Sequence, residues 1–174
     1  SAVIRLNAAL SINLTPSHNP GCYAGYKLNP ADGGPAGEDI TKPLEKCANA
    51  FMKQVFTPVK VNWKKVVKID SKKIYLKHIS ENIPNIIDIK KLRNFIKSGE
   101  ISVAIDHIHG ATRGRAKAFL NIIGSEKNVR IFNQDDNILF HGVKPEPSAK
   151  NMKDVDNYLR KQKTKYKLGA LLDP

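Results

Sequence analysis

With 174 residues, the chain is long enough for one ordinary domain or two small ones, and its 41% hydrophobic content excludes a disordered polar chain. Two cysteines exclude a disulfide framework, and no apolar run reaches the roughly 18 residues of a membrane span. The opening SAVIRLNAAL lacks the pattern of a signal peptide. We therefore expect a reduced, cytoplasmic setting without a membrane partner. The net charge of +13 is carried mainly by lysines that are spread along the chain without interleaved aromatics, which favours a solvated surface over a nucleic-acid interface.

The first third of the chain predicts a strand, a long loop and a helix. Residues 8–14 (AALSINL) have the pattern of a short buried strand that leads into a loop rich in proline and glycine. Loops this long are usually functional in compact domains. Apolar residues at positions 44, 47, 48, 51, 52 and 55 then follow a helical period and place Cys47 in a predicted core.

The remainder predicts alternating helices and strands behind a lysine-rich bridge at residues 57–84. A helix around residues 89–96 ends at Gly99, and another around residues 116–123 ends at Gly124. Predicted strands occupy residues 101–106, 129–132 and 167–173, and a further helix lies around residues 152–159. This alternation predicts an α/β fold with mostly parallel, doubly wound sheets.

The segment Thr15–Pro20 (TPSHNP) is the main candidate for chemistry. A loop serine can carry a covalent group when neighbouring side chains stabilise it and a base accepts the proton of the attacking hydroxyl. His18 and Lys27 are the nearby side chains that offer these functions for Ser17. The same residues are also typical of a turn in which the side chains of Ser17, His18 and Asn19 bond the local backbone, so six residues alone leave both interpretations open.

A wider pattern resembles the α-D-phosphohexomutase superfamily, which includes bacterial phosphoglucomutase and phosphomannomutase. The serine loop resembles the active-site loop of that family, and later segments resemble the turn that opens its second domain, its F…P-x-P…N-L stretch and the start of its metal loop. These pieces match in order and spacing over nearly the whole chain: TPSHNP at 15–20, GYK at 25–27, NPADGGPA at 29–36, DHIHGA at 106–111, Phe140 with PEP at 145–147, and ALLDP at 170–174.

The resemblance implies roles for individual residues. Ser17 would carry the phosphoryl group, and its phosphate would bind Mg²⁺ together with Asp173, the first of three aspartates in the family's metal loop. Lys27 would act as a general acid/base or charge stabiliser, and His18 and Asn19 would help to position phosphate or sugar. Glucose 1,6-bisphosphate is the expected activator. Phosphoryl transfer needs mainly positioning and charge neutralisation, and Mg²⁺ prefers hard oxygen ligands, so these residue types suit the chemistry.

The chain departs from the family at both ends. It lacks the upstream strand of domain I, the later aspartates and arginine of the metal loop, and the counterparts of domains III and IV. We therefore expect residues 1–66 to be the C-terminal part of the phosphoserine-bearing domain I and residues 67–174 to be domain II, truncated at the metal loop. The isolated fragment is expected to be inactive.

The resemblance implies an isomerase that interconverts glucose 1-phosphate and glucose 6-phosphate through a phosphoserine and a bisphosphorylated sugar. Phosphomannomutase and phosphoglucosamine mutase stay open, as does a basic module that binds RNA or another polyanion without catalysis. A steep, sequence-independent salt dependence of oligonucleotide binding would favour that module. The other histidines are interpreted as structural: His107 and His109 belong to a turn, and neither His78 nor His141 shows a partner pattern.

Overall fold

The computed structural model describes residues 2–55 and 57–174 and divides them into two compact units. The first unit combines the described part of residues 1–15 with residues 25–75, and the second combines residues 16–24 with residues 76–174. The mixture of helices and strands confirms the predicted α/β class. No helix within the described residues combines the length and the apolar character that crossing a membrane requires.

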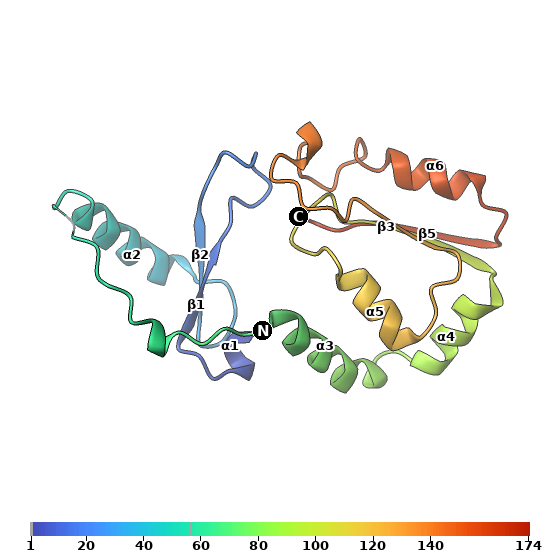
Figure 1. The fold of residues 1–174 in the computed structure, drawn as a ribbon, viewed down its shortest axis with the longest axis horizontal. Helices are drawn as coiled ribbons and strands as arrows, with labels where there is room; N and C mark the ends of the chain where they lie inside the picture. Colours follow the sequence, from blue (N-terminus) through green and yellow to red (C-terminus); the bar gives the residue numbers. More distant parts are fainter. Residues whose placement is uncertain (1, 56) are drawn as a thin grey trace. The chain divides into compact units, whose positions relative to one another are not determined.

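The first unit contains an antiparallel hairpin and one long helix (Figure 1). After the short helix α1 (Ala2–Arg5), β1 (Leu10–Leu14) pairs with β2 (Tyr26–Pro30) from Leu10 opposite Pro30 to Leu14 opposite Tyr26. The predicted strand is confirmed, but the prediction that it is buried is wrong. Leu14 is 87% exposed, because a two-stranded ladder within the described residues supplies no second layer to cover it.

Helix α2 (Glu38–Phe51) confirms the helical period but corrects the expected core. None of its residues is buried, and Cys47 is exposed. Phe51 and Met52 are also largely exposed, since none of the extensive contacts between described elements involves this helix. An apolar period shows which face a helix would bury, and only a packed neighbour can bury it.

The predicted bridge at residues 57–84 contains more structure than expected. A 3₁₀ turn occupies Trp63–Lys65, and α3 occupies Ser71–Asn82, followed by a second 3₁₀ turn at Ile83–Asn85. The apolar periodicity of α3 is weak, so the sequence carried little signal for this helix. Its start is stabilised by Asp70, whose carboxylate accepts hydrogen bonds from the backbone N–H groups of Lys72 and Lys73.

The second unit is built on a parallel sheet with the strand order β4–β3–β5. The central strand β3 (Ile101–Asp106) pairs with β4 (Val129–Phe132) on one side and with β5 (Tyr166–Leu171) on the other. The predicted bounds of β3 and β4 are confirmed, whereas β5 ends before Asp173. Ser102, Ala104 and Asp106 on the central strand are buried.

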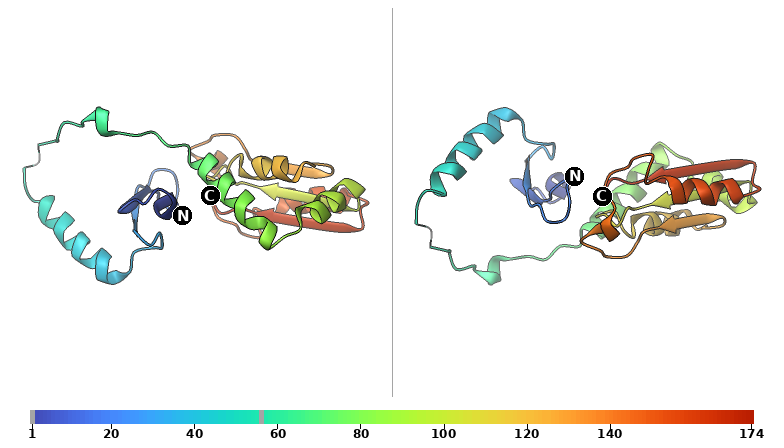
Figure 2. Two further views of the ribbon diagram at one scale, coloured as in Figure 1. Left: turned by 90° about the horizontal axis from the view of Figure 1, so that it is seen from below. Right: turned by 90° about the horizontal axis from the view of Figure 1, so that it is seen from above.

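Helices cover both sides of this sheet. Helix α4 (Ile89–Ser98) contacts β3 and α5 (Arg115–Ile123), and α6 (Lys153–Lys161) contacts β3 and β5. Views from opposite directions show α4 in front of the sheet in one and α6 in the other (Figure 2). Gly99 and Gly124 end α4 and α5 with positive φ, as predicted. The core lies between these helices and the sheet and includes Ile96, Ala118, Leu120, Ile123 and Val155.

Helix α6 packs closely on β5 at Gly169. A Cβ atom at this position would lie 2.7 Å from Val155 Cγ1 and 3.1 Å from Leu159 Cδ1. Overpacking of a filled core typically costs about 1–3 kcal/mol. We expect Gly169→Val to lower the free energy of unfolding by about this amount, measured by urea denaturation of the 174-residue chain.

The matched control for that variant is Gly34→Ala. A Cβ atom there would make only an ordinary contact, 3.5 Å from Asp32 Oδ1. The control should change the free energy of unfolding by no more than about 0.5 kcal/mol. Equal stabilities for Gly169→Val and the unchanged chain would contradict the close packing of α6 on β5.

Candidate functional site

The connections that follow β3 and β4 diverge at the carboxyl edge of the second unit's sheet. The chain passes from β3 through α5 to β4, and then from β4 through α6 to β5 on the far side of β3. Neighbouring strands whose connections leave toward opposite faces form a crevice outside their carboxyl ends. The loops that begin after Asp106 and Phe132 meet at this crevice.

Asp106 organises the crevice. Its side chain is buried, and Oδ1 accepts a hydrogen bond of 2.7 Å from the backbone N–H of Ile108. The amide of Asn133 donates to both carboxylate oxygens, at 3.0 and 2.9 Å. A buried carboxylate is stable only when such donors replace its water. Asp106 therefore ties the β3–α5 turn to the loop that follows β4.

The turn after Asp106 has an unusual backbone. Ile108 and His109 both have positive φ, of 46° and 53°. For a β-branched residue this conformation is strained, and such strain gathers at sites that the surrounding structure holds in place. The N–H of His109 donates to the carbonyl of Asn133 over 3.1 Å, and Arg113 donates to the carbonyl of His109. These bonds hold the strained turn.

His107 lies beneath this turn and is fully buried. Its Nδ1 contacts the hydroxyl of Thr112 at 2.8 Å, while Nε2 has no hydrogen-bond partner among the described residues. Burial lowers the pKa of the His107 imidazole, the nearby Asp106 carboxylate opposes that effect, and Arg113 adds to it. The structural interpretation of His107 fits this environment, in which the neutral ring is favoured.

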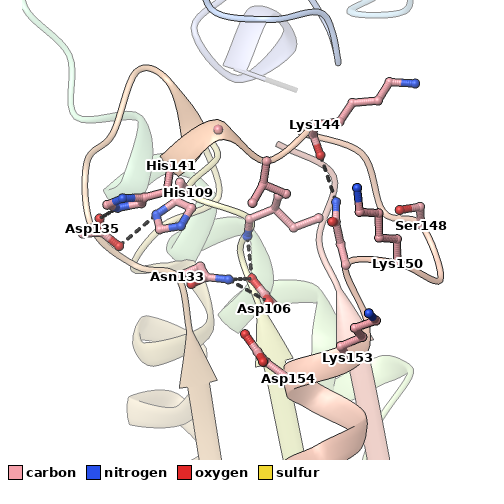
Figure 3. Close-up of a pocket in the computed structure, with 14 residues that line it drawn as sticks. Asp106, His109, Asn133, Asp135, His141, Lys144, Ser148, Lys150, Lys153 and Asp154 are labelled. Carbon is pink, nitrogen blue, oxygen red and sulfur yellow. Dashed lines mark hydrogen bonds and ion pairs between the residues drawn. The ribbon is translucent and has the colours of Figure 1, made fainter.

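A cleft of about 650 Å³ opens at this edge, and Figure 3 shows its lining. One side carries a cluster of His109, Asp135 and His141. The opposite side is formed by the β4–α6 connection and the start of α6 and carries Lys144, Ser148, Lys150, Lys153 and Asp154. Asn151 supports that side by donating to the carbonyls of Lys144 and Glu146, at 2.8 and 2.7 Å.

The predicted carrier serine lies in a four-residue turn of the second unit. The N–H of Asn19 donates to the carbonyl of Pro16 over 3.2 Å, and Ser17 is half-buried with a φ of 58°. Ser17 Oγ is 3.4 Å from His18 Nδ1. The Asn19 side chain donates to the Pro16 carbonyl at 3.0 Å, a local bond of the kind expected for a turn residue.

This turn belongs to a loop that approaches the β4–α6 connection within the second unit. Gly21 lies against the carbonyl of Ile138 so closely that a Cβ atom would overlap it. The hydrogen bond and charge of Lys144 lower the pKa of the Glu146 carboxyl group, and nearby His18 adds a smaller effect in the same direction. The serine loop therefore contacts the same connection that lines the cleft.

The other predicted site residues lie at two further places. Lys27 is an exposed residue of β2 in the first unit, opposite Asn13, and its proximity to Ser17 stays a prediction. Asp173 is exposed just after β5. The chain on both sides of Asp173 is held at the crevice, because Leu172 N–H donates to the carbonyl of Asp106 over 2.8 Å and Pro174 packs against Gly110.

Comparison with known protein families covers most of the chain. Residues 1–54 match the family model for phosphoglucomutase/phosphomannomutase α/β/α domain I, and residues 73–174 match the model for domain II. The chain belongs to the phosphoglucomutase/phosphomannomutase family. The resemblance seen in the sequence is thereby confirmed.

Individual members of the phosphoglucomutase/phosphomannomutase family are also similar to this chain in sequence and fold. A phosphoglucomutase from Komagataeibacter xylinus is 38% identical over 101 residues, which are 56% of this chain and 18% of that protein. A putative phosphomannomutase from Thermus thermophilus superposes with a TM-score of 0.72 at 28% identity, covering 99% of this chain and 36% of that one. Parafusin, a phosphoglucomutase from Paramecium, shares the fold, with a TM-score of 0.73 at 23% identity and 36% of its length covered. The chain thus spans well under half the length of these relatives.

The residues that sequence reasoning missed are Asp135 and His141. Both follow β4, 26 or more positions after His109, and no fixed motif connects them. The sequence shows no partner pattern for His141, and the structure places its Nε2 2.6 Å from Asp135 Oδ2. Their position after a predicted strand was the one indication in the sequence, because the parallel strands β3 and β4 place the residues that follow them at the same edge of the sheet.

Proposed function

We propose that this chain is part of a phosphoglucomutase that interconverts glucose 1-phosphate and glucose 6-phosphate through a phosphoserine at Ser17. The conformation of the Ser17 turn carries the proposal: a left-handed, half-buried serine with His18 Nδ1 3.4 Å from its Oγ lies in the segment that matches domain I. The 38% identical phosphoglucomutase supports glucose as the sugar.

In the proposed reaction, one serine serves both ends of the sugar. The free sugar hydroxyl attacks the phosphorus of phosphoserine, the bond from Ser17 Oγ to phosphorus breaks, and the hydroxyl proton passes to a neighbouring base. The resulting bisphosphate turns over, and Ser17 Oγ recovers a phosphoryl group from the other end. His18 and Asn19 are proposed to position the phosphate, and Lys27 is proposed to act as general acid/base or to neutralise charge.

Mg²⁺ is the proposed cofactor, and the chemistry of the donor set fits it. The Ser17 phosphate and the Asp173 carboxylate would supply hard oxygen ligands, and the segment leading to Asp173 is fixed to β3 through the Leu172–Asp106 hydrogen bond. When bound, the ion would neutralise charge on the transferring phosphoryl group. Lys150 and Lys153 give the neighbouring cleft cationic groups that attract the phosphate of a phosphosugar.

The domain assignment and the finer substrate choice are also proposals. Residues 1–66 would form the C-terminal part of domain I and residues 67–174 domain II, in a cytoplasmic protein whose domains III and IV complete the substrate site. The phosphomannomutase among the structural neighbours keeps mannose phosphate as the second candidate. Comparing kcat/KM for glucose 1-phosphate, mannose 1-phosphate and glucosamine 1-phosphate would distinguish these sugars.

The test of the proposed function compares two polypeptides in a coupled assay. A polypeptide that joins this chain to the remaining family domains should turn over glucose 1-phosphate with Mg²⁺ and glucose 1,6-bisphosphate. Residues 1–174 alone should show no turnover, because the groups that hold the distal phosphate are absent and correct positioning can contribute about 7–11 kcal/mol to lowering a barrier.

Preparations from a host strain without its own mutase serve as the control. Turnover by residues 1–174 alone would show that the active site is assembled differently. If the joined polypeptide turns over none of the three sugar phosphates, the proposed function is wrong.

A further inference from the structure

The cluster of His109, Asp135 and His141 joins two loops at the crevice. His109 belongs to the β3–α5 turn, and Asp135 and His141 belong to the β4–α6 connection (Figure 3). Asp135 lies between the two rings: its Oδ1 is 2.8 Å from His109 Nδ1, and its Oδ2 is 2.6 Å from His141 Nε2. The ring centroids are 4.6 Å apart. Two imidazole nitrogens and one carboxylate therefore lie within 4.8 Å of one another.

His109 Nδ1 has unused bonding capacity. The nitrogen is buried and close enough to Asp135 for an ion pair, but no hydrogen bond of acceptable angle reaches it from the described residues. Because the angle is poor, the ring nitrogen is not directed at the carboxylate. A buried polar atom without an aligned partner is costly in a folded protein, and a metal ion is one group that can satisfy it.

Neighbouring groups hold the backbone at His109 and His141. Asn133 accepts from the N–H of His109 through its carbonyl, as described above, and Asn137 Oδ1 accepts from the N–H groups of Leu139 and His141 at 3.0 and 3.2 Å. Metal sites depend on such supporting contacts to orient their ligands.

We propose that His109 Nδ1, His141 Nε2 and an Asp135 oxygen bind a divalent transition-metal ion of the Zn²⁺ type. One atom from each of the three residues lies within 4.8 Å of the others. Bonds of about 2.0–2.2 Å to imidazole nitrogen and carboxylate oxygen require ligand atoms about 3.3 Å apart. The His–Asp contacts of 2.8 and 2.6 Å would therefore lengthen slightly as the ion enters between the three side chains. All three residues line the cleft, which gives the ion an entry path and leaves a position for water.

The donor set determines the class of ion. Imidazole favours Zn²⁺ and similar ions, whereas Mg²⁺ takes oxygen ligands almost exclusively. The site shares no residue with the proposed Ser17–Asp173 magnesium site, so either proposal can fail without the other. A bound ion would link the β3–α5 turn to the β4–α6 connection and stabilise the second unit.

The experiment uses the metal-stripped 174-residue chain with Cys22 and Cys47 replaced by serine, because both thiols are exposed and could bind zinc themselves. Calorimetric titration with Zn²⁺ near neutral pH should give one ion per chain, at least about 100-fold tighter than Mg²⁺. Co²⁺ should produce visible d–d absorption bands, and Zn²⁺ should raise the melting temperature.

Two single variants test the ligands, and a third is the matched control. His141→Gln and Asp135→Asn should each weaken Zn²⁺ binding at least about tenfold and abolish the Co²⁺ bands, since even supporting contacts are worth roughly 10–100-fold. Both side chains are 56% exposed, so these variants should keep the fold, which far-UV circular dichroism checks. His78→Gln on α3 should bind like the parent. Zinc binding no tighter than magnesium binding, or undiminished in both ligand variants, would overturn the proposal.

Discussion

Ser17→Ala should abolish mutase turnover in the polypeptide that joins this chain to the remaining domains of the family. The variant removes only a hydroxyl from a loop turn, so the backbone bond from Asn19 N–H to the Pro16 carbonyl can still form. Without Oγ there is no atom to accept a phosphoryl group from one end of the sugar and return it to the other. Loss of a covalent nucleophile costs about 10⁴-fold or more in kcat, and we expect a loss of at least that size.

A second measurement separates a lost carrier from a damaged fold. Intact-mass and peptide mapping of the unchanged polypeptide should locate phosphate on Ser17 after exposure to glucose 1,6-bisphosphate, and Ser17→Ala should carry none. The phosphate brings roughly −1.5 to −2 charge, which the proposed Lys27 and Mg²⁺ would balance. Ser80→Ala on α3, where the hydroxyl donates to the carbonyl of Lys77, should keep full turnover. Normal kinetics of Ser17→Ala, or phosphate found only elsewhere, would end the assignment.

Asp106→Ala should destabilise the second unit by about 2–5 kcal/mol, because a buried donor left without its acceptor costs about 1–3 kcal/mol and Asp106 serves more than one. The substitution removes the acceptor of the Ile108 N–H and of both Asn133 contacts. It also frees a turn in which Ile108 and His109 are held at positive φ. The buried donors that lose their acceptor and the strained turn that loses its hydrogen bond both lower the free energy of unfolding.

Urea denaturation of residues 1–174, together with hydrogen exchange of the β3 amides, measures this loss. Asn133→Ala should also destabilise, because it leaves the Asp106 carboxylate with fewer donors, and the double variant should cost less than the sum of the two. Asp156→Ala provides the control: its carboxylate makes a surface ion pair with Arg160, which is worth at most about 1 kcal/mol. Additive effects of Asp106→Ala and Asn133→Ala would contradict their coupling.

The sequence by itself determined the elements whose signals are local. The β-branched run at 101–106 predicted β3, and Gly99 and Gly124 marked the ends of α4 and α5 because glycine adopts their positive φ without strain. The serine loop was recognisable from contiguous residues, and the family followed from their order along the chain. The exposed face of α2 could not be predicted in this way, since burial of Cys47 depends on whether another element covers the helix.

Only the tertiary structure decided which distant side chains meet. Asp106 and Asn133 are 27 positions apart, and His109 lies 26 positions before Asp135. They come together because β3 and β4 are parallel neighbours, so that the turn after one strand and the loop after the other share an edge. Local propensity specifies where each strand forms. Which loops lie next to each other is decided by the pairing of the strands and the direction of the crossover connections, and both depend on contacts between residues far apart in the chain.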